Sequence, residues 1–272
     1  MSKDIHKKKH LSSFQLIILG FASVILLGAI ILMLPVSSAE GVMTPFNQTL
    51  FTSTSAVCVT GLAVLDTGSY WSVFGQVVIL LLIQIGGLGV VTVAVSVFML
   101  SGRKISLMQR STMQNAISAH KVGGIVRLTK FILKGTLFIE MAGALALLPV
   151  FYHDFGRKGI WMAVFHSISA FCNAGFDILG TPTNPFPSIT AYAGNPIVNV
   201  VIMFLIIAGG IGFLTWEDIC INKIHFRKYH MQSKIIVVTT ALLIVLPAVF
   251  FFFSDFTHLS VGKRLLASAF QA

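Results

Sequence analysis

The sequence predicts an all-α polytopic membrane protein built from tandem parallel repeats of a helix, a re-entrant pore helix and a second helix. Composition is the first reason, because 56% of the 272 residues are hydrophobic and only 10% are charged, whereas about a quarter of a soluble domain is charged. The second reason is that five apolar stretches reach the roughly 20 residues that a helix needs to cross a bilayer. The third is a short polar segment that occurs twice between those stretches.

The apolar stretches divide the chain into six segments. They are a cytoplasmic N-terminus at 1–13, a first helix–pore–helix repeat at 14–100, a basic cytoplasmic loop at 101–124, a second repeat at 125–219, a cytoplasmic loop at 220–233 and an incomplete third repeat at 234–272. Spanning helices are expected at 14–35, 73–100, 125–151, 196–219 and 234–253. The first stretch lacks a small-residue cleavage site, so we interpret it as a helix and not as a signal peptide.

Basic residues gather on one side of the predicted membrane. Fourteen of the 19 Lys and Arg residues fall before residue 14, between 103 and 130, or between 223 and 234. Cytoplasmic loops carry an excess of Lys and Arg, so the N-terminus is expected in the cytoplasm and the polar segments are expected to enter from outside. The net charge of +10 therefore indicates topology and contact with lipid headgroups, and no nucleic-acid binding is expected.

Two short helices are expected where the chain re-enters the membrane, at 44–57 and 160–171. Thr44 and Pro45 predict the start of the first one, because Thr is favoured at the N-cap and Pro at the first helical position. A Leu-Pro pair, which ends at Pro35 and again at Pro149, is expected to close the spanning helix before each short one.

The repeated polar segment reads Phe-Thr-Ser-Thr-Ser-Ala-Val-Cys-Val-Thr-Gly at 51–61 and Phe-His-Ser-Ile-Ser-Ala-Phe-Cys-Asn-Ala-Gly at 165–175. Six of the eleven positions are identical, whereas chance predicts about one or fewer. Polar re-entrant segments are tolerated in a membrane only where they are buried in protein or line a water-filled path. Parallel repeats pack around an axis along the membrane normal, so the repetition predicts a central pore.

The end of each polar segment has the chemistry of a cation filter. A dehydrated monovalent cation needs oxygens in place of its water shell, and the backbone carbonyls of an extended chain supply them. The expected ion-binding residues are Val59, Thr60 and Gly61 in the first copy and Asn173, Ala174 and Gly175 in the second. The C-terminal dipoles of the short helices would repel anions there. The alternative, in which the glycines only end two buried helices, does not explain why they recur in the same context.

A glycine-rich motif follows each polar segment, inside the next predicted spanning helix. Its members are Gly86, Gly87 and Gly89 in the first repeat and Gly209, Gly210 and Gly212 in the second. A glycine inside a soluble helix costs about 1 kcal/mol, so close helix packing or a hinge is the expected purpose. A nucleotide-binding glycine loop is not expected, because no strand precedes the motif.

Three ionisable residues are candidates for a role inside the membrane. Glu140 lies in a predicted span, where a carboxylate is by default functional or paired, and Lys134 or a neighbouring helix is its expected partner. Asp66 could add negative potential at the outer mouth or cap a turn. His166 is expected to be a buried, hydrogen-bonded histidine. The sequence has no HExxH, GxSxG or paired-carboxylate pattern, so no enzyme activity is expected.

These motifs resemble those of the Trk/Ktr/HKT superfamily of potassium transporters, most closely its bacterial KtrB-type translocating subunits. The matching stretches are Thr-Gly-Leu-Ala-Val-Leu-Asp-Thr at 60–67, Ile-Gln-Ile-Gly-Gly-Leu-Gly at 83–89 and Phe-Cys-Asn-Ala-Gly-Phe at 171–176. The resemblance implies potassium uptake across a bacterial cell membrane through four such units, with potassium bound at the filter residues. It also implies a homodimer gated by a cytosolic nucleotide-binding ring of the KtrA kind, which alone would bind ATP, ADP or NAD.

The resemblance leaves alternatives for the activity and for the basic loop. The chain ends before a third filter, so one alternative is a truncated, non-transporting membrane subunit, and another is a sodium-permeable cation transporter of the same fold. Glycine instead of serine at both filter positions favours potassium. Arg103, Lys104 and Arg110 of the basic loop are expected to dock the ring, although anionic headgroups would also attract them, by about 1 kcal/mol each.

Overall fold

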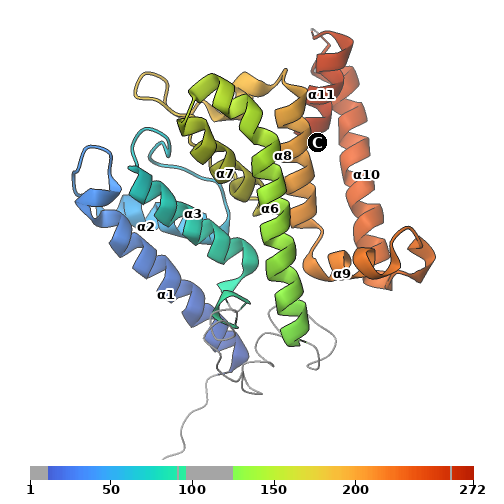
Figure 1. The fold of residues 1–272 in the computed structure, drawn as a ribbon, viewed down its shortest axis with the longest axis horizontal. Coiled ribbons are helices and arrows are strands. Elements are labelled where there is room, and N and C mark those ends of the chain that lie inside the picture. Colours follow the sequence, from blue (N-terminus) through green and yellow to red (C-terminus); the bar gives the residue numbers. More distant parts are fainter. Residues whose placement is uncertain (1–11, 91, 96–124, 258) are drawn as a thin grey trace, which may run out of the picture.

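The computed structural model describes residues 12–90, 92–95, 125–257 and 259–272 (Figure 1). All regular structure in these residues is helical, as the sequence predicts, and no strand occurs among them. In chain order the elements are α1 (Ser13–Met33), η1 (Pro35–Ser37), α2 (Phe46–Cys58), α3 (Val73–Leu88), α6 (Ile125–Phe155), α7 (Lys158–Phe171), η2 (Ser188–Tyr192), α8 (Pro196–Gly210), α9 (Phe213–Asn222), η3 (Phe226–Lys228), α10 (Met231–Ser254) and α11 (Val261–Gln271).

Three described helices, α1, α6 and α10, are long and apolar enough to cross a membrane. The α8 and α9 helices reach that length only together, and they are bent by 100°, while α3 is an apolar helix of 16 residues. The prediction of unbroken helices at 73–100 and 196–219 is therefore wrong. Each helix breaks at a glycine, Gly89 or Gly212, whose φ of +83° only glycine adopts without strain.

Two expected helix ends also differ from the prediction. Thr44 does not cap α2: Pro45 is the N-cap residue, and the Thr44 hydroxyl lies 3.0 Å from the Tyr70 hydroxyl instead. The α6 helix continues through Pro149 to Phe155, whereas α1 ends before its proline as predicted. Proline removes one backbone hydrogen bond, and the burial of Phe151, which lies two residues further on and is 0% exposed, favours continuation of the helix.

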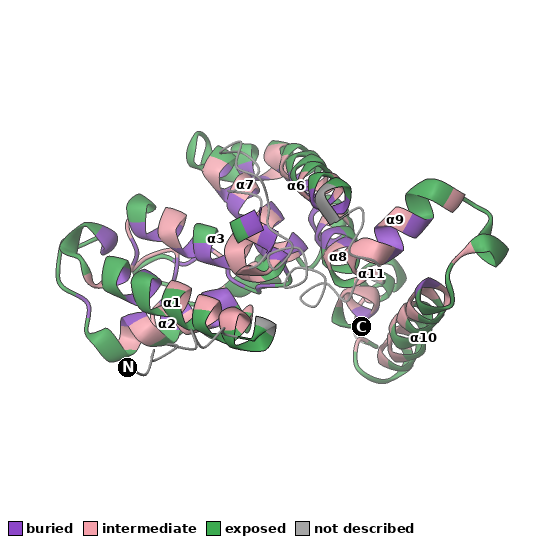
Figure 2. Ribbon diagram, turned by 90° about the horizontal axis from the view of Figure 1, so that it is seen from below, coloured by how far each residue is buried: buried purple, intermediate pink, exposed green. Residues whose placement is uncertain are grey.

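The helices form three groups that follow the chain (Figure 1). The first is α1, α2 and α3, the second is α6, α7 and α8, and in the third α11 packs on α10. Contacts between α3 and α7 join the first two groups, and contacts between α8 and α11 join the third. Figure 2 shows buried positions concentrated where the first two groups face each other, whereas α10 is mostly exposed or half-buried. The short helices α2 and α7 thus lie in the best-packed part of the molecule.

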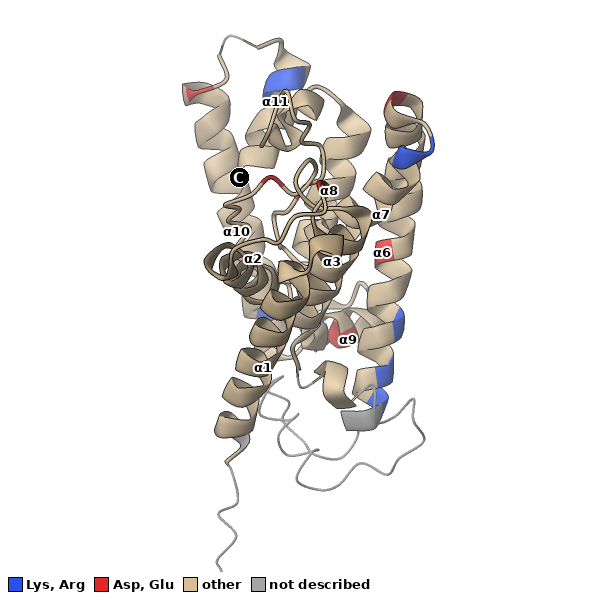
Figure 3. Cartoon of the chain, turned by 90° about the vertical axis from the view of Figure 1, so that its left-hand side faces the viewer, with Lys and Arg blue, Asp and Glu red and all other residues tan. Residues whose placement is uncertain are grey.

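The outer surface of the described helices is strongly apolar. Large exposed side chains include Leu27 on α1, Phe138 on α6 and Leu246 on α10. Figure 3 shows Lys and Arg at the ends of α6 and few charged positions along the helices between those ends. Exposed apolar surface of this extent marks contact with a membrane or a partner, and with three helices of spanning length it indicates a membrane-spanning protein.

Candidate functional site

The chain turns in the same way where α2 and α7 end. Val59 and Asn173 each have a φ of 57°, and Gly61 and Gly175 follow with φ of 72° and 70°. A β-carbon placed on Gly61 would lie 2.8 Å from the Ala174 carbonyl oxygen and 3.3 Å from the Gly175 Cα. The structure therefore brings the two predicted ion-binding segments into contact. Both the backbone angle and the lack of space require glycine at position 61.

A serine of each short helix holds the segment that follows it. The Ser55 hydroxyl lies 2.8 Å from the Thr60 hydroxyl, with either oxygen able to donate. In the second copy, the Ser169 hydroxyl donates to the Phe176 carbonyl oxygen at 2.6 Å. Sequence reasoning missed this role, although both serines are among the six identical positions of the repeated segment. These bonds restrain the backbone on which any ion coordination would depend.

A second serine anchors each short helix to the long helix before it. Ser53 donates to a carbonyl oxygen of α1 and Ser167 to a carbonyl oxygen of α6, both at 2.7 Å, and both serines are 0% exposed. The same glycine contact accompanies both bonds: a β-carbon on Gly28 or on Gly143 would lie 2.5 Å from the serine hydroxyl oxygen. The two helix pairs therefore approach each other by the same means.

The first glycine of each motif packs on the last turn of a short helix. A β-carbon on Gly86 would clash with the Val57 carbonyl oxygen, and one on Gly209 would clash with the Phe171 carbonyl oxygen. Since a backbone oxygen cannot swing aside as a side chain can, these positions tolerate no larger residue without a shift of a helix.

The remaining motif glycines divide between packing and helix breaking. A β-carbon on Gly87 would lie 2.6 Å from the Cys172 sulfur, and one on Gly210 would lie 3.8 Å from the Asn173 amide nitrogen. The last members, Gly89 and Gly212, are the positive-φ breaks of α3 and of the α8–α9 pair. The motif of α3 therefore packs against both copies of the polar segment, and the motif of α8 packs against the second copy. The last glycine of each motif then redirects the chain.

Glu140 is buried and its partner is on a neighbouring helix. The Gln84 side chain of α3 donates from Nε2 to Glu140 Oε1 at 2.9 Å, so the expectation of a neighbouring helix is met and Lys134 is not the partner seen. The amide oxygen of Gln84 accepts from the Cys172 sulfur at 3.8 Å. This chain of contacts joins α6, α3 and the end of α7, which are far apart in the sequence.

Asp66 caps a turn and also joins the segment that follows Gly61 to the segment that follows Gly175. Its Oδ2 accepts from the backbone N–H of Ser69 at 2.7 Å and from the Ser69 hydroxyl at 2.6 Å. Its Oδ1 accepts from the backbone N–H of Phe186 at 2.9 Å. A β-carbon on Gly180 would clash with this carboxylate. Turn capping is thus the alternative observed, and the charge is buried, with Asp66 6% exposed.

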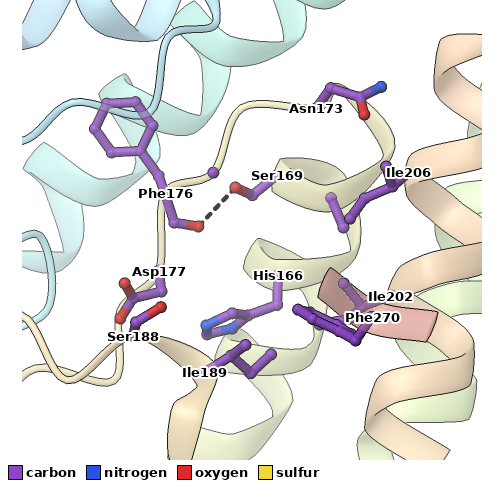
Figure 4. Close-up of a pocket in the computed structure, with 12 residues that line it drawn as sticks. His166, Ser169, Asn173, Phe176, Asp177, Ser188, Ile189, Ile202, Ile206 and Phe270 are labelled. Atoms are coloured by element: carbon purple, nitrogen blue, oxygen red, sulfur yellow. Dashed lines mark hydrogen bonds between the residues drawn. The ribbon is translucent and has the colours of Figure 1, made fainter. Parts of the chain in front are cut away.

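His166 is a buried, hydrogen-bonded histidine, as expected, but only one of its ring nitrogens is bonded. Nδ1 lies 2.7 Å from the Met162 carbonyl oxygen, while Nε2 has no hydrogen-bond partner. The ring lines a cavity of about 280 Å³ that Asn173, Gly175 and Asp177 also line (Figure 4). Sequence reasoning missed Asp177; its signal was a carboxylate two residues after a repeated glycine.

A polar link holds η2 against α6. The Tyr192 hydroxyl donates to Asp154 Oδ2 at 2.8 Å, and the Phe151 ring meets the Tyr192 ring edge to face with centroids 5.4 Å apart. Burial, together with the hydrogen bond to Asp154, raises the pKa of Tyr192. The hydroxyl therefore keeps its proton, and goes on donating, to a higher pH than the hydroxyl of an ordinary tyrosine.

Two further cavities lie near these segments, one beside the second polar segment and one beside the glycine motif of α3. One, of about 340 Å³, is lined by Asn173 and by residues of α8, α10 and α11. The other, of about 390 Å³, is lined by the glycine motif of α3, by Gly212 and by Thr215 and Gln232. Gly89 and Gly212, where the helices break, thus line the same cavity.

Part of the predicted site cannot be placed in the structure. Arg103, Lys104 and Arg110, expected to dock a partner, lie outside the described residues. Within the described part of the chain, no group of three or more His, Cys, Asp and Glu side chains could hold a metal ion.

Known proteins match the chain over most of its length. The sequence profile of the TrkH family, described as "Cation transport protein", matches residues 7–272. The chain is 42% identical over 229 residues to the potassium/sodium uptake protein NtpJ of Enterococcus hirae, covering 84% of the chain and 49% of that protein. It is 39% identical over 265 residues to the Ktr system potassium uptake protein B of Bacillus subtilis, covering 95% of the chain and 58% of that protein.

The Vibrio alginolyticus protein of the same name as the Bacillus one is 34% identical over 227 residues, which are 82% of the chain and 48% of that protein. The chain therefore spans about half the length of the curated relatives it matches.

Proposed function

Because the chain belongs to the TrkH family of cation transport proteins, we propose that it supplies two pore units of the channel-like translocating subunit of a Trk/Ktr-type potassium uptake system. The proposal is carried by the contact between Gly61 and Gly175 and by the matching backbone angles on either side of it. The names of the relatives, which refer to potassium/sodium uptake and to potassium uptake, support it. Transport of this kind needs no enzyme chemistry in the chain.

The proposed pathway runs past the two glycine segments. Carbonyl oxygens of Val59 and Thr60 and of Asn173 and Ala174 replace part of the water shell of a potassium ion, and further units contribute the other oxygens. The positive φ of each glycine lets the extended chain continue outward behind those oxygens. The C-terminal ends of α2 and α7 each add about half a negative charge. A cation is stabilised there and an anion is repelled.

The fold that goes with this function is a parallel repeat. The group α1–α3 corresponds to the predicted unit 14–100 and the group α6–α8, with α9, to the unit 125–219, with α2 and α7 as re-entrant pore helices. The paired serine anchors and the paired glycine contacts support this correspondence. The distribution of Lys and Arg supports an N-terminus in the cytoplasm of a bacterial cell.

The transporter works with other subunits in this proposal. Two curated relatives carry the name of a Ktr system, which supports a multi-subunit assembly. We extend this to a homodimer gated by a cytosolic ring that binds ATP, ADP or NAD, while this chain binds no cofactor. The basic loop at 101–124, with Arg103, Lys104 and Arg110, would dock the ring in addition to resting on anionic lipid headgroups.

Sodium is the second candidate ion. The name of the Enterococcus hirae relative includes sodium beside potassium, and that relative is 42% identical to the chain. Glycine at both filter positions still favours potassium, so the expected order of permeation is potassium before sodium.

Complementation of a bacterial strain that lacks potassium uptake tests the proposal. The intact gene, which encodes the full-length protein with this sequence in it, should restore growth at low potassium and uptake of Rb⁺ as a potassium tracer. Gly61→Ser should abolish that growth, because it adds a side chain at a φ of 72° against the Ala174 carbonyl oxygen. Gly262→Ser is the matched control, since nothing lies within 4 Å of its β-carbon position. Absence of Rb⁺ uptake by the wild type, or normal growth of Gly61→Ser, would contradict the proposal.

A further inference from the structure

The cavity of about 280 Å³ beside the second glycine segment lies between α7, α8, η2 and α11. Gly175 and Asn173 line it on the side of the segment, and Phe270 of α11 lines it opposite. Figure 4 shows the His166 ring reaching from α7 toward the side on which Asp177 and Ser188 lie. The cavity therefore touches the segment proposed to bind ions and carries polar groups with no role so far.

The bonding of His166 fixes which atom it offers to the cavity. Nδ1 lies 2.7 Å from the Met162 carbonyl oxygen, and a carbonyl only accepts, so Nδ1 carries the hydrogen. The Nε2 atom of the neutral ring is then an acceptor. His166 is 4% exposed and Nε2 has no partner among the described residues. A buried acceptor of this kind calls for a group that donates hydrogen bonds.

The carboxylate of Asp177, which also lines the cavity, has the same preference for a donor. Asp177 is half-buried, and its Oδ1 accepts from the Leu179 backbone N–H at 3.0 Å, which leaves the second carboxylate oxygen available. The carboxylate of Asp66, by contrast, is fully engaged by three donors. Water around a cation turns its hydrogens outward, so a wall of acceptors with a negative charge fits a hydrated cation and disfavours an anion.

We propose that this cavity binds a hydrated monovalent cation beside the second filter segment. The charge of Asp177 attracts the ion, and waters of its shell donate to the hydroxyl of Ser188. A small turn of the buried His166 ring brings Nε2 to the cavity, where a further water of the shell donates to it. A shell of about six waters fills roughly 180 Å³ at about 30 Å³ per water, which fits a cavity of about 280 Å³. The inference rests on the proposed cation uptake and adds to it a place where the ion waits before it loses its water.

Rb⁺ located by its anomalous scattering in the full-length transporter tests the site directly. The wild type should show one ion at the glycine segments and a second in the cavity. Asp177→Asn should remove the cavity ion and keep the other, because the amide can still accept from Leu179 but carries no charge. Rb⁺ at the glycine segments alone would overturn this inference and leave the proposed function standing. Rb⁺ at neither place would overturn both.

Transport kinetics give an independent measurement. Asp177→Asn should raise the KM for Rb⁺ uptake about fivefold to tenfold and keep the maximal rate within about twofold, since the site concentrates ions and does not form the filter. Asp255→Asn is the matched control, because Asp255 is exposed at the C-terminal end of α10 and is not among the residues that line the cavity. An unchanged KM in Asp177→Asn would overturn the inference.

The role of the histidine is tested by two substitutions of different chemistry. His166→Gln keeps an acceptor and should hold the KM within about twofold of the wild type. His166→Phe keeps the ring that packs on Phe151, whose centroid lies 5.1 Å away, but removes the acceptor, so the KM should rise about threefold. Equal KM values in these two variants, at equal protein levels in the membrane, would contradict the assignment of His166.

Discussion

The groups α1–α3 and α6–α8 share the contacts that shape their backbones and differ in the side chains behind them. In both, a buried serine bonds a carbonyl of the preceding long helix. Behind the first short helix, the Thr52 hydroxyl donates within its own helix at 2.9 Å. At the matched position of the second, His166 Nδ1 makes the equivalent bond to the Met162 carbonyl oxygen at 2.7 Å, but its larger ring also lines a cavity. The difference teaches that the two short helices are anchored by the same contacts, whereas the side chains around them are free to specialise.

The segments that leave the two glycines repeat this contrast. The first carries Asp66, whose charge is buried and fully bonded. The second carries Asp177, which is half-buried with one bonded oxygen. A carboxylate is thus structural in one copy and available to a ligand in the other.

Alanine at the two proposed filter glycines, Gly61 and Gly175, gives the most direct test of the comparison between the two groups. A β-carbon at positive φ costs roughly 1–2 kcal/mol, and at Gly61 it also meets the Ala174 carbonyl oxygen at 2.8 Å, whereas at Gly175 its nearest neighbour is at 3.5 Å. Since 1.4 kcal/mol is about tenfold in affinity, Gly61→Ala should lower the apparent affinity for Rb⁺ more than about tenfold, and Gly175→Ala about tenfold or less. Rb⁺ uptake against concentration measures both, and a larger loss in Gly175→Ala would reverse the order.

Alanine at the first glycine of each motif should have the next largest effect. Gly86→Ala and Gly209→Ala both push a methyl group onto a backbone carbonyl of a short helix, and overpacking of this kind costs about 1–3 kcal/mol. Both should lower the thermal unfolding midpoint of the purified full-length protein, Gly209→Ala more because its methyl would come closer. Gly262→Ala in α11, with open space around it, should not lower the midpoint. A neutral Gly209→Ala would show that the second group packs differently.

Removal of the serine anchors should have the smallest effect, and the effect should be nearly the same in the two groups. Ser53→Ala and Ser167→Ala each delete one hydrogen bond of 2.7 Å from a fully buried hydroxyl, worth about 1 kcal/mol. The two losses in free energy of unfolding, measured by denaturant titration in detergent, should agree within about 0.5 kcal/mol. A difference several times larger would mean that the two contacts are alike in geometry only.

The sequence alone predicted the helical class, the two short helices, and Gly61 and Gly175 as the glycines that end the polar segments. Composition, the length of the apolar stretches and repetition can all be read directly from the chain. Sequence reasoning named Gly89 and Gly212 as packing or hinge positions but extended unbroken helices through them, since the backbone angle of a glycine in an apolar stretch is set by what the next segment packs against. It also missed the continuation of α6 past Pro149, which the burial of Phe151 favours.

The partner of Glu140 could be narrowed only to Lys134 or a neighbouring helix, because Gln84 is brought to it by contacts between residues far apart in the chain. The cavity around His166 was beyond sequence reasoning for the same reason. Its walls come from four separate elements, and no local pattern records which of them will face one another.

The bonds of Asp66 have a consequence for how such a chain evolves. The carboxylate leaves no room for a side chain at Gly180, so a change at either of these two positions limits the other. Phe186 is held by its backbone N–H, and only proline there would remove that bond. A substitution at Asp66 should therefore be inherited together with one at Gly180, and the segments that follow Gly61 and Gly175 would change as one.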